Sequence, residues 1–218
     1  MVEDQHYIIG KPGMVSCPFG DKLQTFWDLR YEYFELFDYG IMVDRNGLIS
    51  AKPERVSNEL ASRIRGDRVL DAFTGLGMSA IACARAGKQV VCIDTSAERI
   101  ELAKHNAKIY GIQDNLTFIT GDPRHIMREA KQREFDAVIL DPPYNAIQEV
   151  KNSLITLDDF SPPAHQLLQA AASCASQIAF LIPLDFDLNQ LKRFAHHIQI
   201  DDAIVGDDVR YRTAILWN

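Results

Sequence analysis

The chain has 218 residues, of which 47% are hydrophobic and 24% are charged. These values lie near the averages for soluble globular proteins and exclude a fibrous or largely disordered chain. The net charge of −7 argues against tight, non-specific binding of nucleic acid through a broad positive field. The length favours one domain with a short extension.

The segment before residue 53 is expected to form a short helical extension. It crowds aromatic side chains into one stretch, namely Phe26, Trp27, Tyr31, Tyr33, Phe34, Phe37 and Tyr39. Most of them are expected to pack in the interface between the extension and the core. The sequence therefore predicts an extension over residues 1–52 that caps a ligand site, and a catalytic domain over residues 53–218.

From Val56 onward, helices and strands are expected to alternate. Val56, Leu60 and Ile64 form the buried stripe of a helix that starts after Pro53. Short apolar runs predict strands over residues 68–73, 89–93, 116–120, 135–140 and 178–182. Four helices are expected between and after these strands. The first ends at Gly87, and the second begins at a capping box of Thr95 with Glu98. The other two cover residues 164–175 and 188–194.

This alternation is the pattern of βαβ units. Residues 198–205 and 210–217, separated by Gly206-Asp207-Asp208, add an antiparallel hairpin at the end of the chain. The fold class is therefore α/β: a Rossmann-like, doubly wound, mostly parallel sheet of seven strands with an antiparallel C-terminal hairpin.

Acidic residues follow three successive strands of this predicted sheet. Asp71 precedes a turn with Gly75 and Gly77, whose missing Cβ atoms let the backbone approach a ligand beyond the strand ends. Asp71 would contact the cationic amino group of a methionine moiety. Asp94 suits the hydroxyls of a ribose, and Asp122 could accept from an adenine amino group. Together the three acids predict a site for S-adenosylmethionine, which leaves as S-adenosylhomocysteine.

A dinucleotide site is the alternative interpretation of the same residues. Gly75-Leu76-Gly77-Met78-Ser79-Ala80 also satisfies the fingerprint Gly-x-Gly-x-x-Gly/Ala, with Asp94 as its ribose acid. A nicotinamide-dependent oxidoreductase is thus a rival. Against it, Asp71 would repel the pyrophosphate that this fingerprint normally receives. A single acid at a strand end could also be a helix cap, but three in succession favour a ligand.

The tetrapeptide Asp141-Pro142-Pro143-Tyr144 follows the apolar run of the fourth strand. Prolines can simply end a strand. A catalytic interpretation is favoured, because an exocyclic amine is a poor nucleophile whose lone pair is delocalised into the ring. A loop with two hydrogen-bond acceptors can redirect that lone pair. The Asp141 carboxylate and the Pro142 carbonyl can hold both N–H bonds, so that the lone pair points at a sulfonium methyl. Tyr144 can stack on the base. Asp141, Pro142 and Tyr144 are the predicted catalytic residues.

The histidines show no spacing typical of metal ligands, and the chemistry needs no metal, so none is predicted. No apolar run approaches the roughly 18 to 20 residues that span a bilayer, and the first residues lack the pattern of a secretory signal. The cysteines, at positions 17, 83, 92 and 174, are widely spaced and are expected to be buried and reduced. A cytoplasmic protein without membrane contact is expected.

Several stretches, in order along the chain, resemble one branch of the class I methyltransferases, the RNA cap guanine-N2 methyltransferase (trimethylguanosine synthase) family. They are Phe26-Trp27-Asp28-Leu29-Arg30-Tyr31, Phe37-Asp38-Tyr39-Gly40-Ile41, Ser50-Ala51-Lys52-Pro53-Glu54, Asp71-Ala72-Phe73-Thr74-Gly75 and His105-Asn106-Ala107-Lys108-Ile109-Tyr110-Gly111. The resemblance implies methylation of guanine N2 in RNA. It also implies a cofactor site made of the three acids and their neighbours Ala72, Phe73, Gly75, Gly77, Thr95 and Pro123, closed by Phe34, Lys52 and Pro53.

The chain departs from that family where the family usually has Ser-Pro-Pro-Trp. Asp141-Pro142-Pro143-Tyr144 is the form of many bacterial RNA and DNA amino-methyltransferases, so the substrate need not be a cap. The best local basic patch for RNA consists of Arg124, Arg128, Lys131 and Arg133. A solvent-exposed helix face explains these four charges equally well. A DNA base, a protein amide, a small molecule, or a non-catalytic adaptor role remains an alternative. The sequence does not indicate an oligomeric state.

Overall fold

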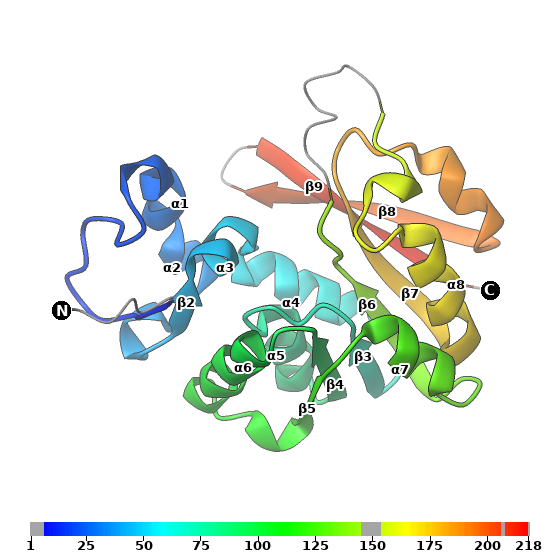
Figure 1. Ribbon diagram of the computed structural model, residues 1–218, viewed down its shortest axis with the longest axis horizontal. Coiled ribbons are helices and arrows are strands. Elements are labelled where there is room, and N and C mark those ends of the chain that lie inside the picture. The colour runs from blue at the N-terminus through cyan, green and yellow to red at the C-terminus, as the bar shows by residue number, and fades with distance from the viewer. Residues whose placement is uncertain (1–6, 145–153, 206–207, 218) are drawn as a thin grey trace.

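A seven-stranded sheet with helices on both faces forms the centre of the molecule (Figure 1). The computed structural model describes residues 7–144, 154–205 and 208–217. The strand order is β5-β4-β3-β6-β7-β9-β8. The strands are β3 (Arg68–Asp71), β4 (Gln89–Asp94), β5 (Leu116–Thr120), β6 (Phe135–Leu140), β7 (Ala175–Ile182), β8 (His197–Val205) and β9 (Asp208–Trp217).

The first five of these strands are parallel, and β9 pairs antiparallel with both β7 and β8. This confirms the predicted α/β sheet and its C-terminal hairpin. The order of the strands reverses beside β3, because β4 and β5 are added on one side of it and β6 and β7 on the other. A crevice therefore opens beyond the carboxyl ends of β3 and β6, where open α/β sheets bind ligands. Residues 206 and 207 of the predicted hairpin turn lie outside the described residues.

Alternating side chains of the strands bury two hydrophobic layers, because successive residues of a strand point to opposite faces. In β6, Ala137 and Ile139 belong to one layer, whereas Val138 and Leu140 belong to the other. The first layer packs against α4 (Glu54–Arg63), α5 (Met78–Arg85) and α6 (Ala97–Ile109). The second packs against α7 (Pro123–Glu129), η5 (Leu157–Asp159), α8 (Ala164–Cys174) and η6 (Leu188–Arg193).

The N-terminal extension joins the first layer and occupies one end of the molecule (Figure 1). The prediction of a helical extension is only partly right, because its helices are very short and two strands pair beside them. The elements are β1 (Tyr7–Ile9), η1 (Asp21–Leu23), α1 (Gln24–Asp28), α2 (Arg30–Tyr33), η2 (Phe37–Tyr39), β2 (Met42–Asp44) and α3 (Arg45–Ser50). Phe34 is extended and Gly40 is left-handed, so no helix continues through them.

One further local prediction is wrong, and two elements end earlier than predicted. The N-cap of α6 is Ser96, whose hydroxyl accepts from the backbone nitrogen of Arg99 at 3.3 Å, so Thr95 is not the cap that the predicted box of Thr95 with Glu98 requires. The helix predicted over residues 188–194 is a 3-10 helix over residues 188–193. In addition, β3 ends at Asp71, two residues before the predicted end.

Asn106 fastens the N-terminal segment to the part of the chain that forms the seven-stranded sheet. Its side chain is fully buried, and its amide oxygen accepts from the Met42 nitrogen at 2.8 Å. The amide nitrogen donates to the Met42 oxygen at 3.0 Å and to the Leu76 oxygen at 3.1 Å. The side chain thus pairs with β2 as a neighbouring strand would, and it links β2 to the glycine-bearing turn.

The change Asn106→Leu is expected to lower the free energy of unfolding by about 1–3 kcal/mol, because it leaves buried backbone groups of Met42 and Leu76 without partners. Urea denaturation measures the loss, and Lys104→Leu, on the exposed side of the same helix, is the control. Equal stability of the two variants would show that this amide does not hold the extension in place.

Candidate active site

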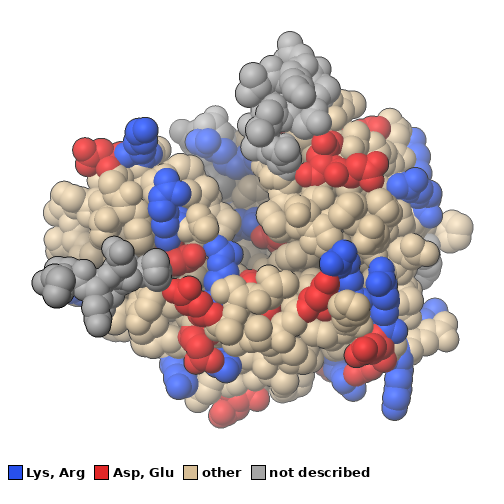
Figure 2. All heavy atoms as spheres, in the orientation of Figure 1, with Lys and Arg blue, Asp and Glu red and all other residues tan. Residues whose placement is uncertain are grey.

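A cavity of about 900 Å³ lies between the extension and the carboxyl ends of the central strands. Figure 2 shows the molecule hollowed near the centre of this face. Ligand sites usually have volumes of about 300 to 1,000 Å³. This cavity is therefore large enough for a nucleoside cofactor with a second planar group beside it.

Most of the predicted site residues line this one cavity, although they come from the extension and from four separate loops. They are Phe34, Lys52, Ala72, Phe73, Gly75, Asp94, Thr95, Asp122, Pro123, Asp141, Pro142 and Tyr144. Pro53, Asp71 and Gly77 are outside its wall. Residues that the sequence did not single out also line it, among them Tyr33, Arg99, Arg210 and Tyr211.

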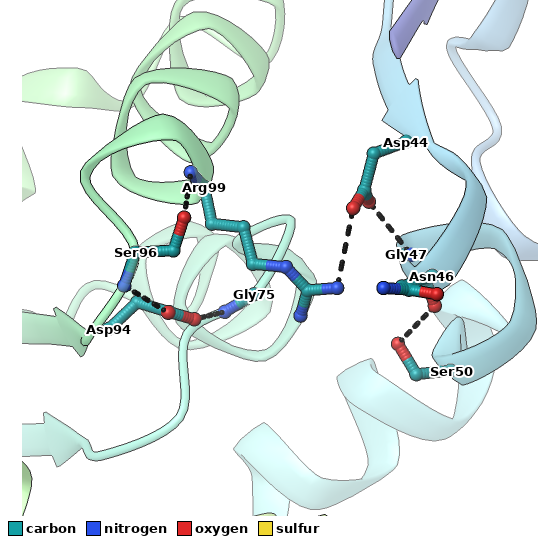
Figure 3. Close-up of polar contacts among 8 residues, drawn as sticks. All are labelled: Asp44, Asn46, Gly47, Ser50, Gly75, Asp94, Ser96 and Arg99. Carbon is teal, nitrogen blue, oxygen red and sulfur yellow. Dashed lines mark hydrogen bonds and ion pairs between the residues drawn. The ribbon is translucent and has the colours of Figure 1, made fainter. Parts of the chain in front are cut away.

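Asp94 holds the glycine-bearing turn in place (Figure 3). Its Oδ2 accepts from the Gly75 nitrogen at 3.0 Å, and its Oδ1 accepts from the Ser96 nitrogen at 2.9 Å. Gly75 has a φ of +53°, which favours glycine. Each carboxylate oxygen keeps further acceptor capacity toward the cavity. The position suits two neighbouring hydroxyl groups of a ribose.

Gly77 has a structural role that needs no ligand. A Cβ atom there would lie 3.2 Å from the Cβ of Ala103, and the φ of +91° is again left-handed. Glycine at this position thus lets the turn pack against α6. Gly47 does the same for the extension, since a Cβ there would lie 2.5 Å from Leu76 Cδ1. Both glycines bring the extension, the turn and α6 close together.

Asp71 is buried under the turn, with only 1% of its surface exposed. Its Oδ1 accepts weakly from the Phe73 nitrogen at 3.4 Å, and its buried Oδ2 has no hydrogen-bond partner among the described residues. Burial raises the pKa of Asp71 to about 7, and the charges of Asp141 and Asp94 add to the effect. A buried acceptor without a donor is the feature that a cationic amino group, reached directly or through water, would satisfy.

The pKa of Asp71 predicts a pH-dependent stability. Because the folded-state pKa of about 7 lies above the ordinary value of 3.8, the stabilising contribution is complete below about pH 4 and is lost as the pH rises toward 7. Asp71→Asn cannot ionise, so its stability relative to the wild type should increase over this range. Denaturation of the ligand-free proteins from pH 4 to 8 tests this, and parallel curves would contradict it.

Asp122 is already engaged by the protein. It is the N-cap of α7, accepting from the Arg124 nitrogen at 2.8 Å, and the Arg124 guanidinium binds it through Nη2 at 2.6 Å. This hydrogen-bonded guanidinium holds the pKa of Asp122 below its usual range. The carboxylate is therefore ionised and fixed at the cavity wall. Its role toward an adenine amino group stays a prediction.

An ion pair connects the cofactor end of the cavity to the extension (Figure 3). Arg99 Nη2 lies 3.3 Å from Asp44 Oδ2, and Asp44 Oδ1 caps α3 by accepting from the Gly47 nitrogen at 2.7 Å. The backbone nitrogen of Arg99 belongs to the first turn of α6, beside Asp94. The sequence does not reveal this pair, because residues 44 and 99 share no local pattern.

The loop after β6 forms the opposite part of the cavity. Asp141 pairs with Lys52 of the extension. The Ser161 nitrogen donates to the Pro143 oxygen at 2.8 Å, which fixes the end of the loop. Tyr144 is 41% exposed, and its ring centroid lies 5.8 Å from that of Phe160. The cavity therefore has carboxylates and a glycine at one end, and at the other an acidic proline loop with an accessible aromatic ring.

The sequence of the chain matches a known protein family. The family model described as RNA cap guanine-N2 methyltransferase matches residues 66–207. The chain belongs to this family. It is 29% identical over 195 residues to a trimethylguanosine synthase of Schizosaccharomyces pombe, covering 84% of this chain and 80% of that protein. It is 26% identical to a trimethylguanosine synthase of Saccharomyces cerevisiae, covering 79% of this chain and 58% of the yeast protein.

Solved structures agree on the fold. A proposed methyltransferase from Porphyromonas gingivalis W83 aligns with a TM-score of 0.67 at 20% identity, over 90% of this chain and 48% of that one. A tRNA (uracil-54, C5)-methyltransferase from Pyrococcus abyssi, solved with S-adenosyl-L-homocysteine, aligns with a TM-score of 0.50 at 18% identity, over 75% of this chain and 37% of that one. The chain spans only part of both proteins.

Membership of the family makes this chain an S-adenosylmethionine-dependent methyltransferase. It decides against the nicotinamide-dependent oxidoreductase and the non-catalytic adaptor. The features at the cavity and beneath its wall fit the cofactor: the buried Oδ2 of Asp71, which has no donor among the described residues, a left-handed glycine at 75 and a carboxylate at Asp94. In the described ranges, helices are too short or too polar to cross a bilayer, and acidic, histidine and cysteine side chains do not cluster as metal ligands.

Proposed function

We propose that this enzyme methylates the exocyclic N2 of a guanine in RNA. Membership of the guanine-N2 family supports the reaction. The observation that carries the proposal is the place of Asp141-Pro142-Pro143-Tyr144: the loop lines the same cavity as Gly75 and Asp94. An amine held by the loop can therefore meet a cofactor held by the turn.

The proposed cofactor residues divide by the part of the cofactor they would meet. Asp94 and Thr95 hold the ribose, and Asp122 with Pro123 flank the adenine. Ala72, Phe73 and Gly75 offer backbone to the methionine end, with Asp71 beneath them. Gly77 supports this turn through its packing on α6.

The chemistry follows from the geometry of the loop. S-adenosylmethionine supplies an electrophilic methyl group when bound. The Asp141 carboxylate and the Pro142 carbonyl accept the two N–H bonds of the amine, which directs the nitrogen lone pair toward that methyl. Tyr144 stacks on the ring. Asp141 also stabilises the positive charge that develops on nitrogen, and after methyl transfer the surplus proton passes from that nitrogen to the Asp141 carboxylate.

We further propose that residues 1–52 cap the site, and that residues 53–218 form the catalytic domain. Glu54 holds the two parts together at this point, because its buried carboxylate accepts hydrogen bonds from both. It accepts from the Glu35 nitrogen at 2.9 Å, from the Tyr110 hydroxyl at 2.6 Å and from Arg85 Nη1 at 2.5 Å. Phe34 and Lys52 then close the cavity from the extension, with Pro53 as the hinge into α4.

The proposal is tested by transfer of a labelled methyl group into fractionated RNA, DNA, protein and metabolites. Label in RNA that is recovered as N2-methylguanosine after digestion supports it, and Asp141→Ala should not give this product. Label confined to DNA, protein or a metabolite would refute it. A cytoplasmic location is part of the proposal, supported by four buried cysteines that form no disulfide.

A further inference from the structure

Lys52 lies at the substrate end of the cavity. Its ammonium pairs with Oδ2 of Asp141, and the two side chains are only 16% and 32% exposed. The same ammonium lies 5.4 Å from the ring centroid of Tyr211, on β9. Lys52 belongs to the extension, Asp141 to the loop after β6 and Tyr211 to the hairpin. Three distant segments thus place a cation directly beside the predicted catalytic carboxylate.

The pair offers an ordered set of hydrogen-bonding groups. Asp141 has two acceptor oxygens, the neighbouring Pro142 carbonyl adds a third, and the Lys52 ammonium carries three donors. Because one ammonium can donate in several directions, Lys52 can stay on Asp141 while it donates to a ligand. The two Asp141 oxygens and the ammonium bound to Oδ2 are therefore arranged as acceptor, acceptor, donor, and the Pro142 carbonyl is a further acceptor.

The Watson–Crick edge of guanine is complementary to this order. It presents the donors N2–H and N1–H, followed by the acceptor O6. Adenine instead presents one amino donor beside the acceptor N1, and cytosine presents one amino donor beside the acceptors N3 and O2. Either base would place a ring lone pair against the Asp141 carboxylate. Buried polar groups that are mismatched in this way discriminate strongly between substrates.

We propose that Lys52 is a specificity-determining residue that donates to O6 of the substrate guanine, while Asp141 accepts from its N1–H and N2–H. This inference rests on the proposed function and deepens it. It moves Lys52 from cofactor binding, which the family resemblance implied, to recognition of the base. It also gives Asp141 two roles, since the same carboxylate orients the amine and rejects adenine.

The test uses three RNAs that differ only at the reactive position, which holds guanine, hypoxanthine or purine. The guanine RNA is the substrate. Hypoxanthine keeps N1–H and O6, purine lacks both, and neither has an N2 amine, so both RNAs act as competitive inhibitors. The inhibition constants are measured for the wild type, Lys52→Met and Lys52→Arg. Lys104→Met, which removes a surface lysine paired with Glu101, is the matched control.

The wild type and Lys104→Met should bind the hypoxanthine RNA at least about 100-fold more tightly than the purine RNA, because two hydrogen bonds to charged groups are gained. In Lys52→Met this ratio should fall about tenfold, while the affinity for S-adenosylhomocysteine is unchanged. Lys52→Arg keeps a donor and should keep most of the preference.

An unchanged ratio of the two inhibition constants in Lys52→Met would overturn the inference, whether or not both inhibitors bind more weakly, because a lysine with a purely structural role would give this result. Loss of cofactor affinity with an unchanged ratio would return Lys52 to the cofactor site. If the wild type failed to methylate the guanine RNA at all, the proposed function would be refuted instead. The two failures are therefore distinguishable.

Discussion

Asp141→Ala is expected to lower the rate of methyl transfer by about 100- to 1,000-fold or more, by analogy with removal of one preorganised hydrogen-bonding group. The variant loses the acceptor that orients the amine and stabilises the charge on nitrogen. The rate is measured in single turnovers at saturating cofactor, so that binding does not contribute. Affinity for S-adenosylhomocysteine should stay near the wild-type value, because Asp141 lies at the substrate end of the cavity.

Asp158→Ala is the control, since Asp158 is an exposed acid that pairs with His165. It should transfer methyl groups at the wild-type rate. Full activity of Asp141→Ala would remove the catalytic role from the proline loop. A parallel loss of cofactor affinity would instead place Asp141 at the cofactor.

Asp94→Ala is expected to weaken binding of S-adenosylhomocysteine by about 100-fold or more. Two hydrogen bonds from ribose hydroxyls to a carboxylate are worth about 1.5 to 3 kcal/mol each, and about 1.4 kcal/mol corresponds to a tenfold change in affinity. The turn would also lose the acceptor that now holds the Gly75 and Ser96 nitrogens. Calorimetric titration measures the effect.

Asp94→Asn separates these two contributions. The amide oxygen can still accept from a backbone nitrogen, so the turn should keep its shape while the ribose loses a charged acceptor. Its affinity should lie between those of the wild type and Asp94→Ala. Wild-type affinity in both variants would exclude Asp94 as the ribose ligand. Asp114→Ala, in an exposed turn after α6, is the control.

The sheet was predictable because its information is local. Runs such as Val138, Ile139 and Leu140 are apolar on both faces, as a strand covered by helices on each side requires. The turn at Gly75 and the loop at Asp141 were found for the same reason, since each joins a strand to a short motif. Parallel strands then bring their carboxyl ends together, which gathers residues that are far apart in the chain.

The contacts between the extension and the catalytic domain could not be predicted in this way. Lys52 with Asp141 and Arg99 with Asp44 join residues that have no common periodicity. The motif around Asn106 was recognised by resemblance, but its use as a partner for β2 is visible only in the structure. Tyr211 was missed because a single tyrosine in a hairpin strand has no motif around it.

The crystal structure of the enzyme with S-adenosylhomocysteine is the most direct measurement of the central claim. We expect the ribose on Asp94, the methionine end against Gly75, and the sulfur facing the loop that carries Asp141 and Tyr144. A cavity that stays empty beside Gly75, or a bound sulfur that points away from Tyr144, would contradict the account.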